Sequence, residues 1–175
     1  MTEHATARRG RPDQVPPWRD RRWVATGVGW GVAATVVMTA VMFAGVTTGV
    51  APMPKPIPIA LVAHTLGKLP MPALLGLGLA AHFGYGGAGG LVFATLTRRA
   101  NLVSGAAYGV VLWLLIDLVW LPYLGWGVFG TAITPAIGGA TLLLHLIYGT
   151  TLGGLLGRFH PGRGRTTAGM KEATR

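Results

Sequence analysis

The chain has no cysteine and few charges: 11% of its residues are charged, against about a quarter in soluble domains. The missing cysteine excludes disulfides, zinc–cysteine sites, iron–sulfur clusters and thiol catalysis. Acidic residues are scarcest, and Asp117 is the only one outside the chain ends. The sequence also lacks a nucleophile elbow, a P-loop and a metalloprotease helix motif. We therefore do not expect an enzyme.

Charge is missing from long stretches of the sequence. Residues 23–54 and 69–97 contain no charged side chain, and Asp117 is the only one within 100–157. Uncharged apolar stretches of more than about 18 residues predict membrane-spanning helices. The stretch 100–157 is too long for one crossing, and turn-forming residues after Leu121 divide it.

We therefore predict an all-α integral membrane protein with a four-helix transmembrane bundle in residues 23–158. The predicted spans are about 24–47, 73–97, 102–122 and 134–157. A proline-rich outer loop, 48–72, joins the first two spans and is expected to contain a short interfacial helix or a lid. The first apolar stretch exceeds the roughly 7–15 residues of a signal-peptide core, so we expect it to stay uncleaved.

Basic residues predict the orientation. They gather in the tails 1–22 and 159–175 and in the link Arg98–Arg99, whereas the outer connections hold only Lys55 and Lys68. Because Lys and Arg favour the cytoplasmic side, both termini should be cytoplasmic, in a bacterial or archaeal inner membrane. Basic ends attract anionic lipid headgroups, at about 1 kcal/mol per residue near the surface. They form no patch along the chain, so we expect no nucleic-acid partner.

Glycine, with 28 residues, is unusually common. In soluble helices each glycine costs about 1 kcal/mol relative to alanine, but in a bilayer small residues at four-residue spacing let helices approach closely. The pattern predicts packing within the chain, in a homo-oligomer or in a larger membrane complex. The predicted packing glycines are Gly78, Gly86, Gly90, Gly149 and Gly153.

The motif His-x-x-Tyr-Gly occurs twice, beginning at His82 and at His145. A shorter Gly-x-x-aromatic-Gly-Val match relates residues 27–32 to 105–110. Together the matches predict two tandem helical hairpins of the same orientation, as in parallel transporter repeats. This alignment places Asp117 opposite Thr39.

Residue counts from the outer helix ends place the polar residues of the four spans within one helical turn of the same depth. Polar groups are costly in hydrocarbon, so such a layer is a candidate functional site. Its predicted members are Asp117, His82, His145, Thr39, Tyr85 and Tyr148.

The sequence leaves several uses of this layer open. The first is packing in a non-enzymatic structural or accessory membrane subunit, with a neutral Asp117 bonded within the bundle. The second is a proton- or ion-linked small carrier that uses Asp117 and the histidines. The third is ligation of haem b or a divalent metal by His82 and His145. His64, in the outer loop, is expected to be solvated.

Several short motifs resemble the uncharacterised YagU-like family of small four-span bacterial and archaeal membrane proteins, over residues 24–157. They are residues 31–42, Ala81-His82 with Gly86, 104–109 with Trp113, and 145–149 with Gly153. The resemblance implies a four-helix inner-membrane protein. It implies no activity, because that family has none assigned.

Overall fold

The computed structural model describes residues 21–97 and 99–159, in which helices and their connections form the whole fold and no strand occurs. The long helices are α1 (Arg21–Thr47), α3 (Met71–Leu96), α4 (Leu102–Leu115) and α6 (Ala136–Phe159). The short elements are α2 (Ile57–Leu66), a π-helical turn (Ile116–Trp120), α5 (Leu121–Tyr123) and a 3-10 turn (Val128–Gly130). The all-helical class is confirmed. Most of both predicted tails, and Arg98, lie outside the described residues.

Three helical segments are individually long and apolar enough to cross a membrane. They are Arg22–Thr47, Leu102–Tyr123 and Ala136–Phe159. Helix α3 qualifies only together with α2, from which it is bent by 116°. The described part of the chain therefore holds three such helices, or four if the bent pair forms one span.

Local sequence explains where several helices begin and end. Helices α2 and α3 each have a proline in the first turn, where the missing N–H removes no helical hydrogen bond. Gly67 ends α2 at a φ of 78°, a left-handed conformation that glycine adopts without strain. At the start of α4, Asn101 and Ser104 cap each other through bonds of 2.9 and 3.0 Å.

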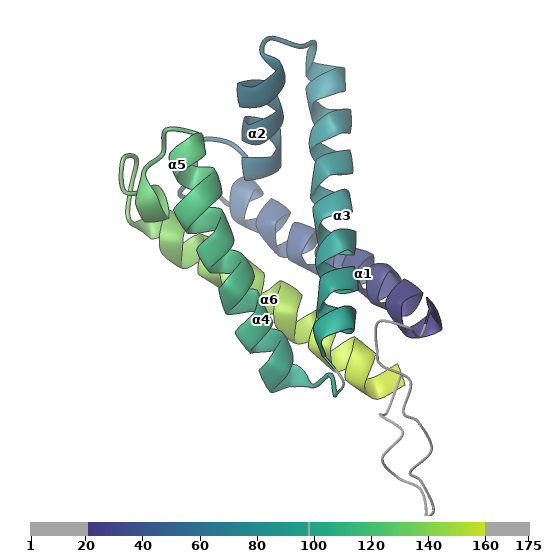
Figure 1. Ribbon diagram of the computed structural model, residues 1–175. Coiled ribbons are helices and arrows are strands. Elements are labelled where there is room, and N and C mark those ends of the chain that lie inside the picture. The colour runs from purple at the N-terminus through teal and green to yellow at the C-terminus, as the bar shows by residue number, and fades with distance from the viewer. Residues whose placement is uncertain (1–20, 98, 160–175) are drawn as a thin grey trace, which may run out of the picture.

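The helices pack as two pairs, α1 with α3 and α4 with α6, and α6 also packs along α1 (Figure 1). The connection after α1 leads into α2, which turns back beside the first half of α3 (Figure 1). The predicted short helix in the 48–72 connection is therefore present. It packs against α3.

Glycine lets the first pair of helices touch backbone to backbone. A β-carbon on Gly31 would collide with the carbonyl of Gly86 and the α-carbon of Gly90, and one on Gly90 would collide with Gly27. At Gly86 an added carbon would overlap the hydroxyl of Thr35. Gly86 and Gly90 are therefore packing residues within the chain.

The second pair of helices has a similar seam. Gly149 faces the backbone of Gly105 and Gly109, and Gly153 faces Gly105 and Asn101. Gly149 and Gly153 thus also pack within the chain. The carbonyl of Gly86 and the α-carbon of Gly90 face Gly31, just as those of Gly149 and Gly153 face Gly105.

The seams differ from the predicted alignment by one helical turn. By contacts Gly31 corresponds to Gly105, whereas the sequence match pairs Gly31 with Gly109. Along its helix, Asp117 therefore lies one turn farther from Gly105 than Thr39 lies from Gly31. The two residues do not occupy equivalent positions in the two helix pairs. Gly78 differs too: a β-carbon there would come 3.0 Å from Ile59 of α2, so this glycine admits α2 and not another long helix.

Candidate functional site

A cavity of about 430 Å³ lies between α2 and the long helices, at the depth of both histidines. That volume falls within the range of small-molecule sites, about 300–1,000 Å³. Its walls come from α1, the connection before α2, α2, α3, the α4 segment with its π-helical turn, and α6. The lining residues are Met38, Met42, Met53, Ile57, Pro58, Leu61, Val62, Thr65, Leu66, Ala81, His82, Tyr85, Gly86, Leu112, Ile116, Trp120, Thr141, Leu144, His145 and Tyr148.

The lining is mostly apolar, and it contains no Asp, Glu, Lys or Arg among the described residues. Apart from Thr65 and the indole of Trp120, its polar side chains belong to α3 and α6, which form the polar wall. The thioethers of Met38, Met42 and Met53 supply flexible apolar surface. Polar atoms come from the two histidines and from a few hydroxyl side chains. The cavity therefore suits an uncharged, mostly apolar molecule with a small polar group.

His145 is held by its own helix. Its Nδ1 lies 2.7 Å from the backbone oxygen of Thr141, one turn earlier. A carbonyl oxygen only accepts, so Nδ1 carries the hydrogen and Nε2 of the neutral ring is a bare acceptor. No described residue bonds that Nε2, and it is not among the fully enclosed polar atoms. Because His145 lines the cavity, Nε2 is available there.

His82 is held by the neighbouring helix. Its Nε2 lies 3.0 Å from the hydroxyl of Thr39, and that hydroxyl donates its single hydrogen to the backbone oxygen of Thr35 at 2.7 Å. His82 Nε2 must therefore be the donor to Thr39, which leaves Nδ1 of the neutral ring as a bare acceptor. Two predicted members of the polar layer, Thr39 and His82, are thus paired across α1 and α3.

Both imidazoles line the cavity. Each is about nine-tenths buried, with 9% of His82 and 8% of His145 exposed. The structure therefore brings the two motif histidines to one wall, each with one committed nitrogen and one bare nitrogen.

Asp117 is fully buried and does not line the cavity. Its carboxylate oxygens lie 2.9 and 3.1 Å from the hydroxyl of Thr141, which is in the cavity wall. Since the backbone oxygen of Thr141 binds His145, one threonine links the carboxyl group to the histidine. The predicted layer thus forms two groups, Thr39–His82 and Asp117–Thr141–His145.

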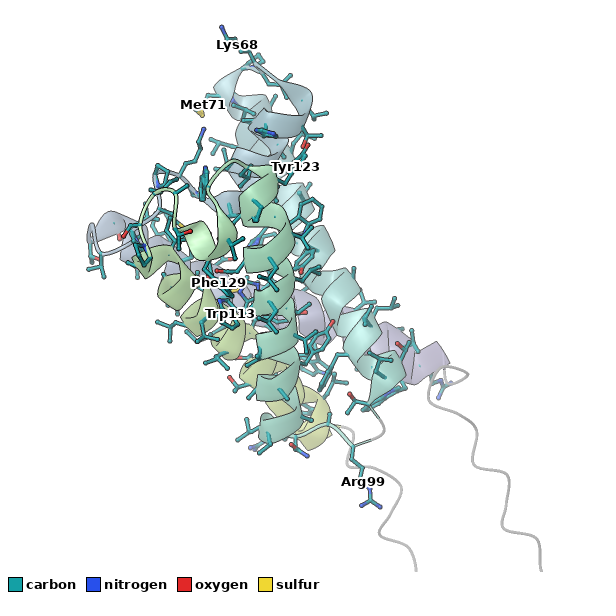
Figure 2. The ribbon with its side chains drawn as sticks, turned by 60° about the vertical axis from the view of Figure 1, so that its left-hand side comes forward. Lys68, Met71, Arg99, Trp113, Tyr123 and Phe129 are labelled. Atoms are coloured by element: carbon teal, nitrogen blue, oxygen red, sulfur yellow. The ribbon has the colours of Figure 1, made fainter. Side chains whose placement is uncertain are left out.

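Asp117 sits in the π-helical turn that follows α4. Such turns add a residue to a helix and often occur at functional sites. Trp113, one turn before, donates from its indole nitrogen to the backbone oxygen of Gly138 at 3.0 Å. Its ring packs against Phe129, with ring centroids 5.2 Å apart (Figure 2). Phe129 has a left-handed φ of 55°, unusual for a bulky side chain. These residues enclose the carboxyl group.

The two motif tyrosines differ. The Tyr148 hydroxyl donates to the backbone oxygen of Gly86 at 2.6 Å and so joins α6 to α3. The Tyr85 hydroxyl is buried and has no hydrogen-bond partner in the described residues. Neither hydroxyl is hydrogen-bonded to His82 or His145. Tyr108, which the sequence did not single out, donates to Gly89 at 2.9 Å.

Only His82 and His145 offer bare nitrogens for a metal ion or haem at this wall. Among residues 21–97 and 99–159, no three His, Cys, Asp or Glu side chains come together as metal ligands. Asp117 is engaged by Thr141 and stands behind the wall. Any haem propionates would also find no Arg or Lys in the described lining.

His64 lies away from this wall. It is exposed on α2, and its ring meets the edge of Tyr123 with centroids 4.8 Å apart. The hydroxyls of Thr65 and Tyr123 lie 3.3 Å apart. These contacts attach α2 to α5, so His64 contributes to how the cavity is covered.

Sequence reasoning missed Thr141 as a site residue, although it stands four residues before His145 in the same stripe as the packing glycines. It also missed the contribution of α2 and Trp120 to the cavity. No local pattern marks Trp120 or the lining residues of α2, because their role depends on how α2 returns to the bundle.

The fold and site define an all-helical protein with three or four helices capable of crossing a membrane and a mainly apolar cavity. The chain belongs to the family of unknown function DUF6789, whose model matches residues 21–167. No curated protein and no solved structure matches the chain significantly. The YagU-like resemblance thus stays a prediction, while membership of a family without assigned function is shown.

Proposed function

We propose that the chain is a four-span inner-membrane protein of a bacterium or archaeon that acts without catalysis, by holding a membrane-soluble amphiphile in the cavity. The observation that supports this proposal is a mostly apolar cavity of about 430 Å³ with His82 and His145 in its polar wall. Such a combination is typical of ligand sites, which are mostly apolar with a few placed polar groups. In this role the protein is an accessory subunit that presents or stores a lipid.

The proposed orientation has both termini in the cytoplasm. Figure 2 places Lys68 at one end of the molecule and Arg99 at the opposite end, as expected if the link between α3 and α4 is cytoplasmic. The basic ends then contact anionic headgroups. The glycines of the two seams are used within the chain. Gly29, Gly76, Gly84 and Gly139 have open space beside them and are available to a second copy or a larger complex.

The absence of cysteine makes the topology directly testable. Met71 and Leu102 are exposed, at 63% and 62%, at the start of α3 and of α4. We expect M71C to react with a membrane-impermeant maleimide in intact cells, and L102C only after the membrane is opened. Labelling of both from outside, or of neither, would contradict the four-span arrangement.

Binding in the cavity is tested with an alkyl diazirine amphiphile in liposomes that contain the purified protein. After illumination, the attached probe should map to cavity residues. Leu61→Trp, on the α2 wall, should block labelling by filling the space. Leu77→Trp, whose side chain is exposed on α3, is the matched control and should leave labelling unchanged. Labelling spread evenly over exposed helix surfaces, and insensitive to Leu61→Trp, would overturn the proposal.

A proton- or ion-linked carrier is the second candidate, favoured by the connected group Asp117–Thr141–His145 that ends in the cavity. Its test is proton flux into liposomes with the wild-type protein and with Asp117→Asn. Flux that the substitution removes would establish this candidate. An absorbance spectrum of the purified protein separates the remaining rival: a haem Soret band lost in His82→Ala and His145→Ala would assign the histidines to haem.

A further inference from the structure

We infer that the cavity selects an uncharged lipid whose headgroup carries a hydroxyl, such as a long-chain alcohol. The inference rests on the proposed function, and it names the class of molecule that the site would take. It depends on which hydrogen-bonding groups of the polar wall are already used and which remain.

The polar wall contains hydrogen-bond acceptors that no described protein group uses. His145 Nδ1 is committed to the oxygen of Thr141, and His82 Nε2 to the hydroxyl of Thr39. Each neutral ring therefore turns one bare nitrogen, an acceptor, to a ligand. Neither nitrogen is enclosed by protein: the only fully buried, unpartnered polar side-chain atoms of the described residues are Trp30 Nε1 and Tyr85 Oη. A ligand hydroxyl, which donates a single hydrogen, can satisfy one of these two acceptors.

The wall has few donors to offer. The Thr141 hydroxyl is occupied by Asp117 and by carbonyl oxygens of its own helix, at 2.9 to 3.1 Å. The Tyr148 hydroxyl is bonded to Gly86. The Tyr85 hydroxyl is free of partners but enclosed. The other donors of the described lining, the hydroxyl of Thr65 and the indole N–H of Trp120, belong to α2 and to the π-helical turn. A ligand that only accepts, such as an ether or an ester, therefore gains little from the helices of the two histidines.

Charge argues against ionic headgroups. No Lys or Arg lines the cavity in the described residues to pair with a carboxylate or phosphate. Burying an unpaired charge is far costlier than burying a hydroxyl that is hydrogen-bonded. Phospholipids and fatty-acid anions should therefore be poor ligands, and an alcohol a good one.

Three diazirine probes of one chain length test this selectivity, with an alcohol, a methyl ether or a carboxylate as the headgroup. In liposomes containing the wild-type protein, the alcohol should label cavity residues about fivefold more than the ether. This is the ratio of affinities that one neutral hydrogen bond produces. The carboxylate should label them least. Replacing His82 and His145 together by Leu should reduce the alcohol to the level of the ether, whereas replacing both by Gln, which keeps acceptors, should retain part of the preference.

Leu143→Ala is the control, because Leu143 is exposed on the helix of His145 and does not line the cavity, and it should leave the alcohol preference intact. Equal labelling by alcohol and ether in the wild-type protein, or stronger labelling by the carboxylate, would overturn the inference while the proposed amphiphile site stands. Absence of cavity labelling by all three probes would overturn the proposed function itself. The comparison of the three probes in the wild-type protein tests the inference even if a histidine variant fails to fold.

Discussion

The hydroxyl oxygen of Thr141 lies 2.9 Å from one carboxylate oxygen of Asp117 and 3.1 Å from the other, and both residues are buried. This contact joins the π-helical turn to α6 immediately behind the cavity wall. It also positions the backbone oxygen that holds His145. The stability of the site should therefore depend on this pair more than on either histidine.

Thr141→Val should destabilise the protein by about 1–3 kcal/mol, because it keeps the shape but leaves the Asp117 carboxyl group without its hydroxyl partner. The measurement is unfolding by SDS titration from mild detergent micelles. Thr150→Val is the matched control on α6, since its hydroxyl bonds only carbonyls of its own helix. Equal losses for the two variants would contradict the role given to the Thr141 contact.

Replacing glycine with alanine should affect the stability of the protein differently on the two faces of α3. Gly90→Ala should destabilise the protein by about 1–3 kcal/mol, because the new carbon collides with the backbone at Gly27 and Gly31. Gly84→Ala should be neutral or stabilising by up to about 1 kcal/mol, since its side is open and alanine favours a helix. The same unfolding measurement compares them. A loss at Gly84 as large as at Gly90 would argue that Gly84 is packed against a second copy.

The tyrosines of the repeated motif should respond differently to loss of their hydroxyl. Tyr148→Phe should cost about 1 kcal/mol, because the bond to Gly86 joins two helices. Tyr85→Phe should be neutral or stabilising, because it removes a buried hydroxyl without a partner. Unfolding curves of the two variants measured side by side test this. A loss for Tyr85→Phe would mean that its hydroxyl has a bonded partner, such as a water molecule.

The contrast between Tyr85 and Tyr148 shows which features of the site can be predicted from the sequence and which cannot. The repeated His-x-x-Tyr-Gly motif singles out His82 and His145, which both line the cavity, because a histidine in an uncharged helix is rare enough to stand out. It cannot tell Tyr85 from Tyr148, since their partners lie on other helices. The alignment with Asp117 opposite Thr39 is off by one turn, because glycine matches at four-residue spacing fit neighbouring registers equally well.

Other features depend on tertiary contacts that leave no local signal. The π-helical turn around Asp117 lies in an apolar segment whose pattern is that of an ordinary helix. The return of α2 depends on the turn at Gly67 and on the space beside Gly78. The sequence predicts a short helix in that connection. Its position over the cavity follows only from the fold.

The placement of α2 is itself testable, because the natural chain has no cysteine to interfere. His64 and Tyr123 bring their rings to 4.8 Å, so H64C with Y123C should be joined in high yield by a short bifunctional thiol reagent. Pairing H64C with V103C is the control, because Val103 is exposed at the other end of the α4 segment.

Replacing Gly78 with a larger residue should lower the yield of this cross-link. The β-carbon of any larger residue comes 3.0 Å from Ile59, so Gly78→Phe should push α2 away from α3 and lower the yield severalfold. Gly76→Phe, where the added carbon meets open space, should leave the yield unchanged. Because α2 supplies a wall of the cavity, Gly78→Phe should also reduce probe labelling in parallel. A high cross-link yield in Gly78→Phe would show that α2 is attached by its contacts with α5 and not by its seat on α3.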